Sequence, residues 1–433
     1  MKIEIMKNTL LAVSIFAFSA FGQEKLALND AITIALENNY DLKIRQADEK
    51  VAGISNSWGA AGSYPSINFS VASNNIWDYN DNADFTQERL TGGATLNWLL
   101  FDGFAVWIRK DKLELYEELS AGNTMIVIEN TVQSVILSYY KVLLEFEKVH
   151  VAETLKNLSY DRFDNESQRQ QIGTLTTYDL LQAKNSWLED QGRFLMQEVV
   201  YKNAIRDLNY LMAEPPDRTW DFIEDFGVQP KIFSVDSLNQ KMISNNSTLK
   251  NQYLNQSLLQ KEVSLKRSEW WPSLTLNGGY SDVSNRLSPD GAPSSTQDSY
   301  NYNATLNLSW SLFNGGNRKR AIEIAKIDRE TGDIEIENMK HALTNQLYNY
   351  HEIHLVRREL LDVAEEALET AQLNLNISEE KFRSGAINSF NYRDVQLLYL
   401  NAAVNRLDAI YAYIDVEAAL MRLTGGIISQ YEE

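Results

Sequence analysis

The sequence predicts a long, mainly helical rod that carries four β-strands at one end and is built from two copies of one unit. Three observations lead to this fold class: heptad-spaced apolar residues in long stretches without proline, short runs in which apolar and polar residues alternate, and an alignment of the two halves of the chain. The composition agrees, because 20 glycines and 7 prolines in 433 residues are few for a loop-rich all-β protein.

The composition also excludes several classes of function. With 59 acidic against 40 basic residues the formal charge is −19, which argues against nucleic acid as a partner because phosphate binding needs an excess of lysine and arginine. The absence of cysteine excludes disulfides, thiolate metal sites and thiol nucleophiles. A hydrophobic content of 44% is enough for a substantial core, so intrinsic disorder is excluded as well.

Residues 1–22 are typical of a secretory signal peptide. Lys2 and Lys7 supply the positive start, Leu10 to Phe18 the apolar run, and Ala20 to Gly22 the small residues of a cleavage site. No other run of about 18 apolar residues occurs, so no transmembrane helix is expected. The sequence therefore leaves three locations open: the periplasm, the cell exterior and an outer membrane.

The two halves of the chain align as an internal duplication. A shift of 207 residues aligns 31–69 with 238–276, and a shift of 212 aligns the residues from 96 onward with those from 308 onward. The paired positions include Asn39 and Asn246, Pro65 and Pro272, Trp98 and Trp310, Gly103 and Gly315, and Gly173 and Gly385. The predicted organisation is a signal peptide 1–22, a first repeat 23–212, a linker 213–235, a second repeat 236–424 and a carboxyl-terminal tail 425–433.

Each repeat is predicted to begin with a helix, over 28–62 in the first repeat and over 235–269 in the second. Apolar residues recur on one helical face in both stretches. Pro65 and Pro272 follow these helices, and a residue before proline is driven out of the α region. The two helices are therefore expected to end just before these prolines.

A hairpin of two strands is predicted after each first helix, over 66–101 and 273–313, because apolar and polar residues alternate near both ends of each range, over 66–71 and 94–100 and over 273–276 and 303–312. The polar stretches 74–89 and 281–302 are predicted to be the loops at the hairpin tips. Four strands cannot close into a membrane barrel alone, so a membrane location requires an oligomer: a dimer, trimer or tetramer supplies eight, twelve or sixteen strands. The alternative is that the hairpins pack on the helices of a soluble rod.

The aromatic residues Trp98, Phe101, Trp310 and Phe313 lie at the strand ends opposite these loops. An aromatic girdle of a membrane barrel lies at such a place. Packing at the junction of sheet and helices explains the same residues, and the two roles are compatible.

After Gly103 the chain runs to about Gln171 without proline, with apolar residues in a heptad seam. A helix of about 68 residues is roughly 100 Å long. Gly173 allows a sharp break, and a shorter helix over 175–212 returns. The return helix and the first helix, stacked end to end, are expected to cover the long one. The second repeat has the same break at Gly385.

The order of these pieces resembles the TolC-like outer membrane efflux channels over nearly the whole mature chain. The resemblance lies in the segments Leu28 to Leu42, Trp98 to Gly103, Trp310 to Gly315, Gly173 to Ala183 and Gly385 to Asp394. It implies a mainly helical protein with a membrane β-barrel: a homotrimer in which four strands per chain complete a twelve-stranded barrel in outer membrane lipid. A tunnel of helical hairpins continues the barrel through the periplasm, with the linker 213–235 and the carboxyl-terminal tail as a belt around its middle.

The resemblance further implies the passive exit duct of a tripartite efflux or type I secretion system. Such a duct has no catalytic residue, cofactor or metal. An inner-membrane pump of RND or ABC type supplies the energy through a periplasmic adaptor, and nucleic acid is not a partner.

The resemblance also implies three sets of site residues. The periplasmic tips, which contact the adaptor, correspond to Gly173, Thr174, Leu175, Asp179, Gly385, Ala386, Ile387 and Asn391. The entrance constriction corresponds to Asp394 and Phe382, and three copies of Asp394 attract cations. The junction of barrel and tunnel corresponds to Pro65, Trp98, Phe101, Gly103, Pro272, Trp310, Phe313 and Gly315.

Two qualifications follow from the residues themselves. Asp179 also fits a plain helix-start role, which the helix dipole favours. Some relatives carry a tyrosine before and an arginine after the second tip glycine, and these side chains latch the closed entrance. Phe382 and Ile387 stand there in this chain, so a latch of that kind is not expected.

Two other functions stay open at this point. A secreted coiled-coil scaffold or adhesin without channel activity also fits the heptad seams. An enzyme with His351 and His354 as metal ligands is the third possibility, although their spacing is not that of the His-Glu-x-x-His metalloproteases.

Overall fold

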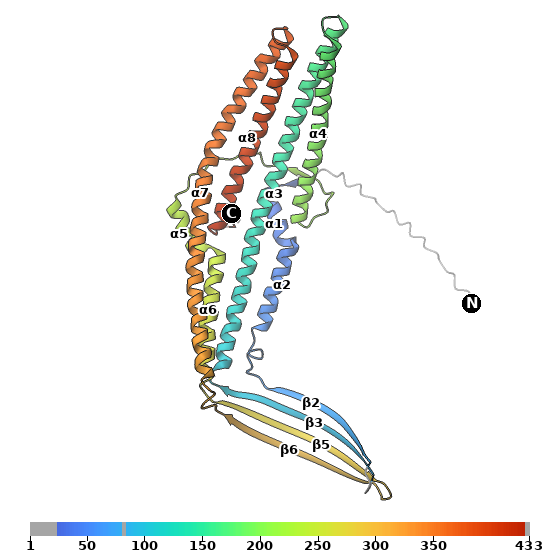
Figure 1. The fold of residues 1–433 in the computed structure, drawn as a ribbon, viewed down its shortest axis with the longest axis vertical. Helices are drawn as coiled ribbons and strands as arrows, with labels where there is room; N and C mark the ends of the chain where they lie inside the picture. The colour runs from blue at the N-terminus through green and yellow to red at the C-terminus, as the bar shows by residue number, and fades with distance from the viewer. Residues whose placement is uncertain (1–23, 80–83, 429–433) are drawn as a thin grey trace, which may run out of the picture.

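A computed structural model describes residues 24–79 and 84–428. The predicted signal peptide 1–22 therefore lies outside the described residues. The chain forms an elongated bundle of helices with a four-stranded sheet that projects from one end (Figure 1). The predicted fold class is confirmed: the protein is mainly helical, with long helical hairpins, antiparallel strands and two repeated halves.

Eight helices build the bundle in the described part of the chain. They are α1 (Leu28–Asn38), α2 (Tyr40–Ser55), α3 (Ala105–Gln171), α4 (Thr177–Leu211), α5 (Val235–Asn245), α6 (Ser247–Ser268), α7 (Asn317–Arg383) and α8 (Ser389–Leu423). The two long helices, α3 and α7, have 67 residues each, so each is about 100 Å long. Helix α3 packs on α4 and α7 packs on α8, and α3 and α8 join the two hairpins (Figure 1).

The structure corrects the prediction of one unbroken first helix in each repeat. Asn39 separates α1 from α2 and Asn246 separates α5 from α6, because both residues have extended rather than helical ψ angles, 129° and 118°. The side chain of Asn39 accepts a hydrogen bond from the Leu42 amide and that of Asn246 from the Leu249 amide. Each asparagine thus starts the following helix as its amino-terminal cap.

The same asparagines bind the ends of the return helices α4 and α8. The Asn39 amide Nδ2 donates to the carbonyl oxygen of Leu211, and that of Asn246 to the carbonyl oxygen of Leu423, both at 3.0 Å. Leu211 and Leu423 are the last residues of α4 and α8. The predicted end-to-end stacking of two shorter helices along one long helix is therefore confirmed.

The strands form one antiparallel sheet in the order β2 (Ser66–Asp78), β3 (Phe85–Asp102), β5 (Ser273–Pro289) and β6 (Ser295–Ser309). The pairing of β3 with β5 joins the two repeats, with a bulge between Leu99 and Phe101. In the described residues, β2 and β6 are the two edges of this sheet and pair with no further strand.

Most of the residues predicted as tip loops belong to the strands. The ladder pairs 74–78 with 85–89 and 281–287 with 295–301, through pairs such as Asn74 with Arg89 and Asp282 with Tyr300. Polar side chains meet across it: the Gln87 amide donates to Asn285 at 2.8 Å. Polar side chains interrupt the apolar face there, so the alternation that marks a strand is weaker in the sequence.

A hydrophobic core lies at the middle of the rod, where the linker crosses α3. Tyr139 of α3 is completely buried, and its hydroxyl donates to the carbonyl oxygen of Leu26 at 2.9 Å. Leu26 belongs to β1 (Glu24–Leu26), which pairs in parallel with β4 (Trp220–Phe222) of the linker. The segment before α1 and the linker are thereby held against the same point of the long helix.

Among the described residues, no helix is long and apolar enough to cross a membrane.

Candidate channel entrance and sheet–helix junction

The two helical tips have the same backbone construction. Gly173 and Gly385 adopt left-handed φ angles of 78° and 77°, which favour glycine because it lacks a Cβ. The amide of the following residue then bonds back to the end of the long helix: Thr174 N to Arg169 O at 2.9 Å, and Ala386 N to Lys381 O at 2.8 Å. These bonds close off the long helix and turn the chain toward the return helix.

The return helices also begin in the same way. Thr176 accepts from the Asp179 amide at 3.2 Å and Asn388 from the Asn391 amide at 2.8 Å. The Thr176 hydroxyl in turn donates to the Asp179 carboxylate at 2.7 Å. Asp179 therefore performs the helix-start role that the sequence left open, and it remains half-buried at the tip.

The residues predicted to contact an adaptor all lie at or just beyond these two turns, at one end of the rod (Figure 1). Gly173, Thr174, Gly385, Ala386 and Asn391 are exposed, and Leu175, Asp179 and Ile387 are half-buried. The tips thus expose small residues at the turns, with the larger side chains of Ile172, Tyr178 and Phe390 exposed beside them.

The two residues predicted for the constriction have different surroundings. Asp394 is exposed on the first turns of α8. Phe382 is only 3% exposed, and its ring stacks on Tyr392 with centroids 4.8 Å apart. Phe382 therefore packs α7 against α8 and presents no free surface, which leaves Asp394 as the exposed candidate.

A buried ionic cluster near the tips was not predicted from the sequence. Arg393 of α8 binds the Asp190 carboxylate of α4 with both guanidinium nitrogens, at 2.6 and 2.8 Å. Arg162 of α3 donates to the carbonyl oxygen of Ser389 at 3.1 Å. Burial, together with the neighbouring Arg393, lowers the pKa of Arg162 to about 10. These contacts join the first repeat to the second.

A sequence signal for this cluster exists. Leu155, Ser159, Arg162 and Glu166 have a four-three-four spacing of their own, one position before the continuation of the α3 seam, and all are buried. Buried positions in such a seam usually carry apolar residues. An arginine and a glutamate in such a heptad-spaced set therefore indicate a polar contact with another helix.

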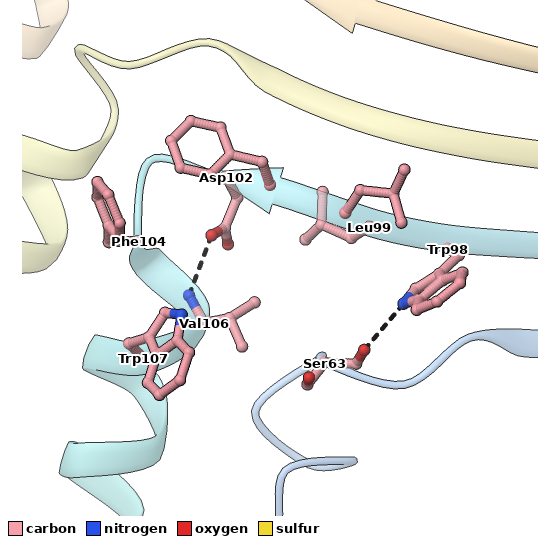
Figure 2. A pocket seen from close by; sticks show the side chains of 9 residues that line it. Ser63, Trp98, Leu99, Asp102, Phe104, Val106 and Trp107 are labelled. Atoms are coloured by element: carbon pink, nitrogen blue, oxygen red, sulfur yellow. Dashed lines mark hydrogen bonds between the residues drawn. The ribbon is translucent and has the colours of Figure 1, made fainter.

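The junction of sheet and helices uses the predicted tryptophans as hydrogen-bond donors (Figure 2). Trp98 Nε1 donates to the carbonyl oxygen of Ser63, and Asp102 accepts from the Val106 amide at the start of α3. In the second repeat Trp310 Nε1 donates to the carbonyl oxygen of Trp270, and both tryptophan bonds are 3.0 Å long. Each indole ties a strand end to the segment that ends the preceding helix.

The other predicted junction residues surround these bonds. Pro65, Phe313 and Gly315 are exposed, Phe101 and Pro272 are half-buried, and Gly103 is buried. Phe101 meets Phe104 edge to face, with centroids 5.3 Å apart. The tryptophan rings remain open on one side, since Trp98 is 38% and Trp310 58% exposed. The two tryptophans thus have an observed structural role at the junction. Their role in an aromatic girdle stays a prediction.

Of the two histidines considered as metal ligands, His351 contacts the linker and His354 contacts α8. His351 Nε2 lies 3.1 Å from the carbonyl oxygen of Phe233, and His354 Nε2 lies 3.2 Å from the Tyr413 hydroxyl. His354 is completely buried. In the part of the chain that the structure describes, no group of three or more His, Cys, Asp or Glu side chains could hold a metal ion.

Two helical hairpins with matching tips, joined to a sheet that is apolar on one face and open at both edges, define the class of the protein: one subunit of an outer membrane channel with a periplasmic helical extension. The chain belongs to the family described as "Outer membrane efflux protein", which matches residues 31–214 and 238–426. The two matched segments correspond to the two repeats. The protein is accordingly an outer membrane efflux channel protein and not an enzyme.

Relatives and solved structures agree with this membership. The outer membrane protein TolC of Vibrio cholerae is 22% identical over 372 residues, which cover 84% of this chain and 83% of TolC. The crystal structure of CusC has a TM-score of 0.75 at 16% identity, with 92% of each chain covered. The CmeC outer membrane channel of Campylobacter jejuni has a TM-score of 0.74 at 14% identity, with 98% of this chain and 94% of CmeC covered. At these identities the solved structures show the fold.

Proposed function

We propose that three copies of this chain form one exit duct, which receives its cargo from an inner-membrane pump of RND or ABC type through a periplasmic adaptor. Trimers in tripartite systems are characteristic of the family to which the chain belongs. The duct performs no chemistry, and the pump supplies the energy.

The incomplete sheet is the observation that carries the proposal. Its edge strands β2 and β6 are unpaired in the described chain, and exposed apolar side chains cover one face, among them Ile67, Phe69, Leu306 and Leu308. Unpaired backbone groups are not tolerated in lipid. Pairing of β6 with β2 of the next copy removes every edge, and three copies give twelve strands in a closed barrel.

The tips support the second part of the proposal, contact with an adaptor. Both turns expose small residues around Gly173 and Gly385 at the end of the rod far from the sheet. A second hairpin can approach the two glycines closely because glycine has no side chain.

Asp394 is the residue that we assign to the entrance constriction. It is exposed near the tip, and a trimer brings three of these carboxylates around one axis. A ring of carboxylates attracts cations.

The test is to isolate the protein from outer membranes and to measure its mass in detergent and its conductance in planar bilayers. We expect a trimer that conducts with a preference for cations. Asp394→Ala should lower that preference, whereas Asp415→Ala, an exposed aspartate further along the same helix, should not. A monomer in the soluble periplasm, or a protein without conductance such as a scaffold, would contradict the proposal.

A further inference from the structure

We infer that a leucine stripe on α4 of one copy fills the groove between α7 and α8 of the next copy. The contact between copies is therefore aliphatic at positions where the equivalent contact inside the chain is ionic. This inference rests on the trimer proposed above and names the surfaces that join its copies.

The groove lies between α7 and α8 on the half of the rod that leads to the tips. It has a volume of about 840 Å³, and its lining includes Leu360, Val363, Ala367, Leu398 and Ala402. Val363 is 61% and Leu398 52% exposed. Alanines leave room between the two helices for side chains from outside, and an apolar groove of this kind favours an apolar occupant.

The duplication shows how such a groove is covered. The shift of 212 residues places Ala367, Asn374 and Ala402 at the positions of Leu155, Arg162 and Asp190 in the first repeat. The three first-repeat residues are at most 4% exposed, and α8 supplies contacts to this surface through Arg393 and the carbonyl oxygen of Ser389. Ala367 and Asn374, by contrast, are exposed. The groove of the second repeat is therefore the equivalent surface, but no helix of the described chain packs on it.

The repeat relation also identifies the missing cover. Helix α8 becomes α4 under the same shift, so α4 of another copy should lie in the α7–α8 groove as α8 lies against α3 and reaches α4 through Arg393. In the ribbon α4 and α7 are on opposite sides of the molecule, with α3 and α8 between them (Figure 1). A ring of copies therefore brings α4 of one chain beside α7 of the next.

The exposed face of α4 fits this position. Leu181, Leu188 and Leu195 recur every seven residues and are 53%, 47% and 53% exposed. We call these three residues the α4 leucine stripe. Leu195 corresponds to Leu407 of α8, which is only 5% exposed. A heptad stripe of leucines is the pattern of a helix that packs against other helices.

The chemistry of the two contacts differs. Inside the chain, Arg393 binds Asp190 at 2.6 Å and Lys148 binds Asp408 at 2.7 Å. The shift of 212 residues gives the pairs expected between copies. Leu181 and Ala402 take the places of Arg393 and Asp190, and Leu360 and Met196 take the places of Lys148 and Asp408. Both ion pairs are thus replaced by apolar pairs.

In the half of the rod next to the sheet, a polar contact inside the chain is again replaced by an apolar pair between copies. Inside the chain Asn251 packs so closely on Gly122 that a Cβ there would lie 1.9 Å from the Asn251 side-chain oxygen. Ile44 is the equivalent of Asn251 under the shift of 207 residues, and Ile334 is the equivalent of Gly122 under the shift of 212. The two isoleucines are 57% and 68% exposed. Two isoleucines replace a glycine and an asparagine, so burial of aliphatic surface joins the copies along the rod.

The cysteine-free chain allows a direct test by cross-linking. The double variant Ala402→Cys with Leu181→Cys, treated in the intact oligomer with a short bismaleimide, should give covalent dimers and trimers on a denaturing gel. Each single variant should give none. The matched control Lys148→Cys with Asp408→Cys bridges an observed contact inside one chain and should give only cross-linked monomer.

A second measurement addresses the stripe without cross-linking. Leu195→Asp should reduce the trimer fraction in detergent at least tenfold, whereas Leu373→Asp should leave it unchanged. Leu373 is 61% exposed, and its equivalent in the first repeat, Asp161, is exposed as well, so neither lies in the predicted contact.

The outcomes separate the two proposals. A normal trimer that gives no intermolecular product from the Ala402→Cys and Leu181→Cys pair, or that tolerates Leu195→Asp, overturns the inference but leaves the exit duct standing. Absence of any oligomer from the unaltered protein contradicts the exit duct itself.

Discussion

Gly103 and Gly315 occupy equivalent positions after the two hairpins, yet their surroundings differ. Both have left-handed φ angles, 70° and 67°. A Cβ at Gly103 would lie 2.3 Å from the carbonyl oxygen of Ser268, whereas a Cβ at Gly315 would meet nothing within 4 Å. The comparison shows that the two repeats share a backbone plan but not the same packing. Within one chain the second repeat packs against Gly103 of the first, but no described segment packs in the same way against Gly315 of the second.

Hydrogen bonds that shape the backbone are the same in both repeats. The two asparagine caps, the two tip turns and the two tryptophan bonds recur with the same donors and acceptors. Side chains that face the other repeat differ, as Asp190 and Ala402 do. The following predictions use equivalent positions to separate what the repeats share from what they do not.

The largest effect is expected at Asp190. Its side chain is completely buried, and Asp190→Ala removes the carboxylate that Arg393 binds. Breaking a buried ion pair from one side costs about 3–5 kcal/mol of the free energy of unfolding. Guanidinium unfolding of the purified protein measures this loss.

The control is Arg406→Ala, which removes an exposed ion pair with Glu365. Exposed pairs contribute less than about 1 kcal/mol. Equal losses in the two variants would show that the buried pair has no special role in joining the repeats.

The two junction glycines should respond unequally to alanine. Gly315→Ala is expected to cost about 1–2 kcal/mol, because an L-residue is strained at a left-handed φ. Gly103→Ala adds to this strain a contact with backbone that cannot be relieved by a side-chain rotation, so its loss should be clearly larger. The free energies of unfolding of the two variants, measured side by side, check this difference.

A trimer sharpens the same comparison. If the next copy packs on Gly315 as Ser268 packs on Gly103, Gly315→Ala should weaken the trimer although it disturbs little in a single chain. An unaffected trimer would show that the outer side of the second repeat stays open at this point.

The two asparagine junctions should respond equally. Asn39→Ala and Asn246→Ala each remove a helix cap together with a hydrogen bond to the end of a return helix. Loss of a cap costs about 1 kcal/mol. Thermal unfolding of both variants should give similar shifts, and a large difference would contradict a shared structural role.

The smallest effect concerns pH and His354. Burial, with His351 and Arg358 nearby, holds the pKa of His354 below its ordinary value of 6.5. The unfolded chain therefore takes up this proton first, so the stability that the neutral imidazole contributes above pH 6.5 is lost as the pH falls through the lowered pKa.

The first repeat supplies the matched variant. Val142, equally buried, is the residue equivalent to His354. His354→Val should remove this part of the pH dependence when unfolding free energies are compared at about pH 7.5 and about pH 5.5. An unchanged pH dependence would show that His354 does not titrate in this range.

Several features could be predicted from sequence because they depend on neighbouring residues along the chain. The long helices follow from heptad spacing, and the tips follow from Gly173 and Gly385, whose left-handed angles the structure confirms. The caps at Asn39 and Asn246 were missed although both asparagines were aligned, since an apolar face that continues past the break hides it. The length of the strands was missed where polar side chains interrupt the apolar face of the sheet.

The candidate site was predicted less completely. Phe382 was expected at the constriction but packs on Tyr392, and the cluster of Arg162, Asp190 and Arg393 was not expected at all. These contacts join residues that lie far apart in the chain. Local spacing gives the face of a helix on which a residue lies, but it does not give the helix that meets this face.

The sequence by itself determined the duplication, the helix and strand periods and the two helical tip turns at Gly173 and Gly385, because each depends on the conformational preferences of a few consecutive residues. Only the tertiary structure decided that β3 pairs with β5, that α8 lies against α3, and that the first repeat meets the second through buried ions. Such contacts depend on complementary shape and charge between distant segments. The same reasoning explains why Ala402, Leu181, Ile44 and Ile334 look unremarkable in the sequence and acquire a role only when the two repeats are compared in space.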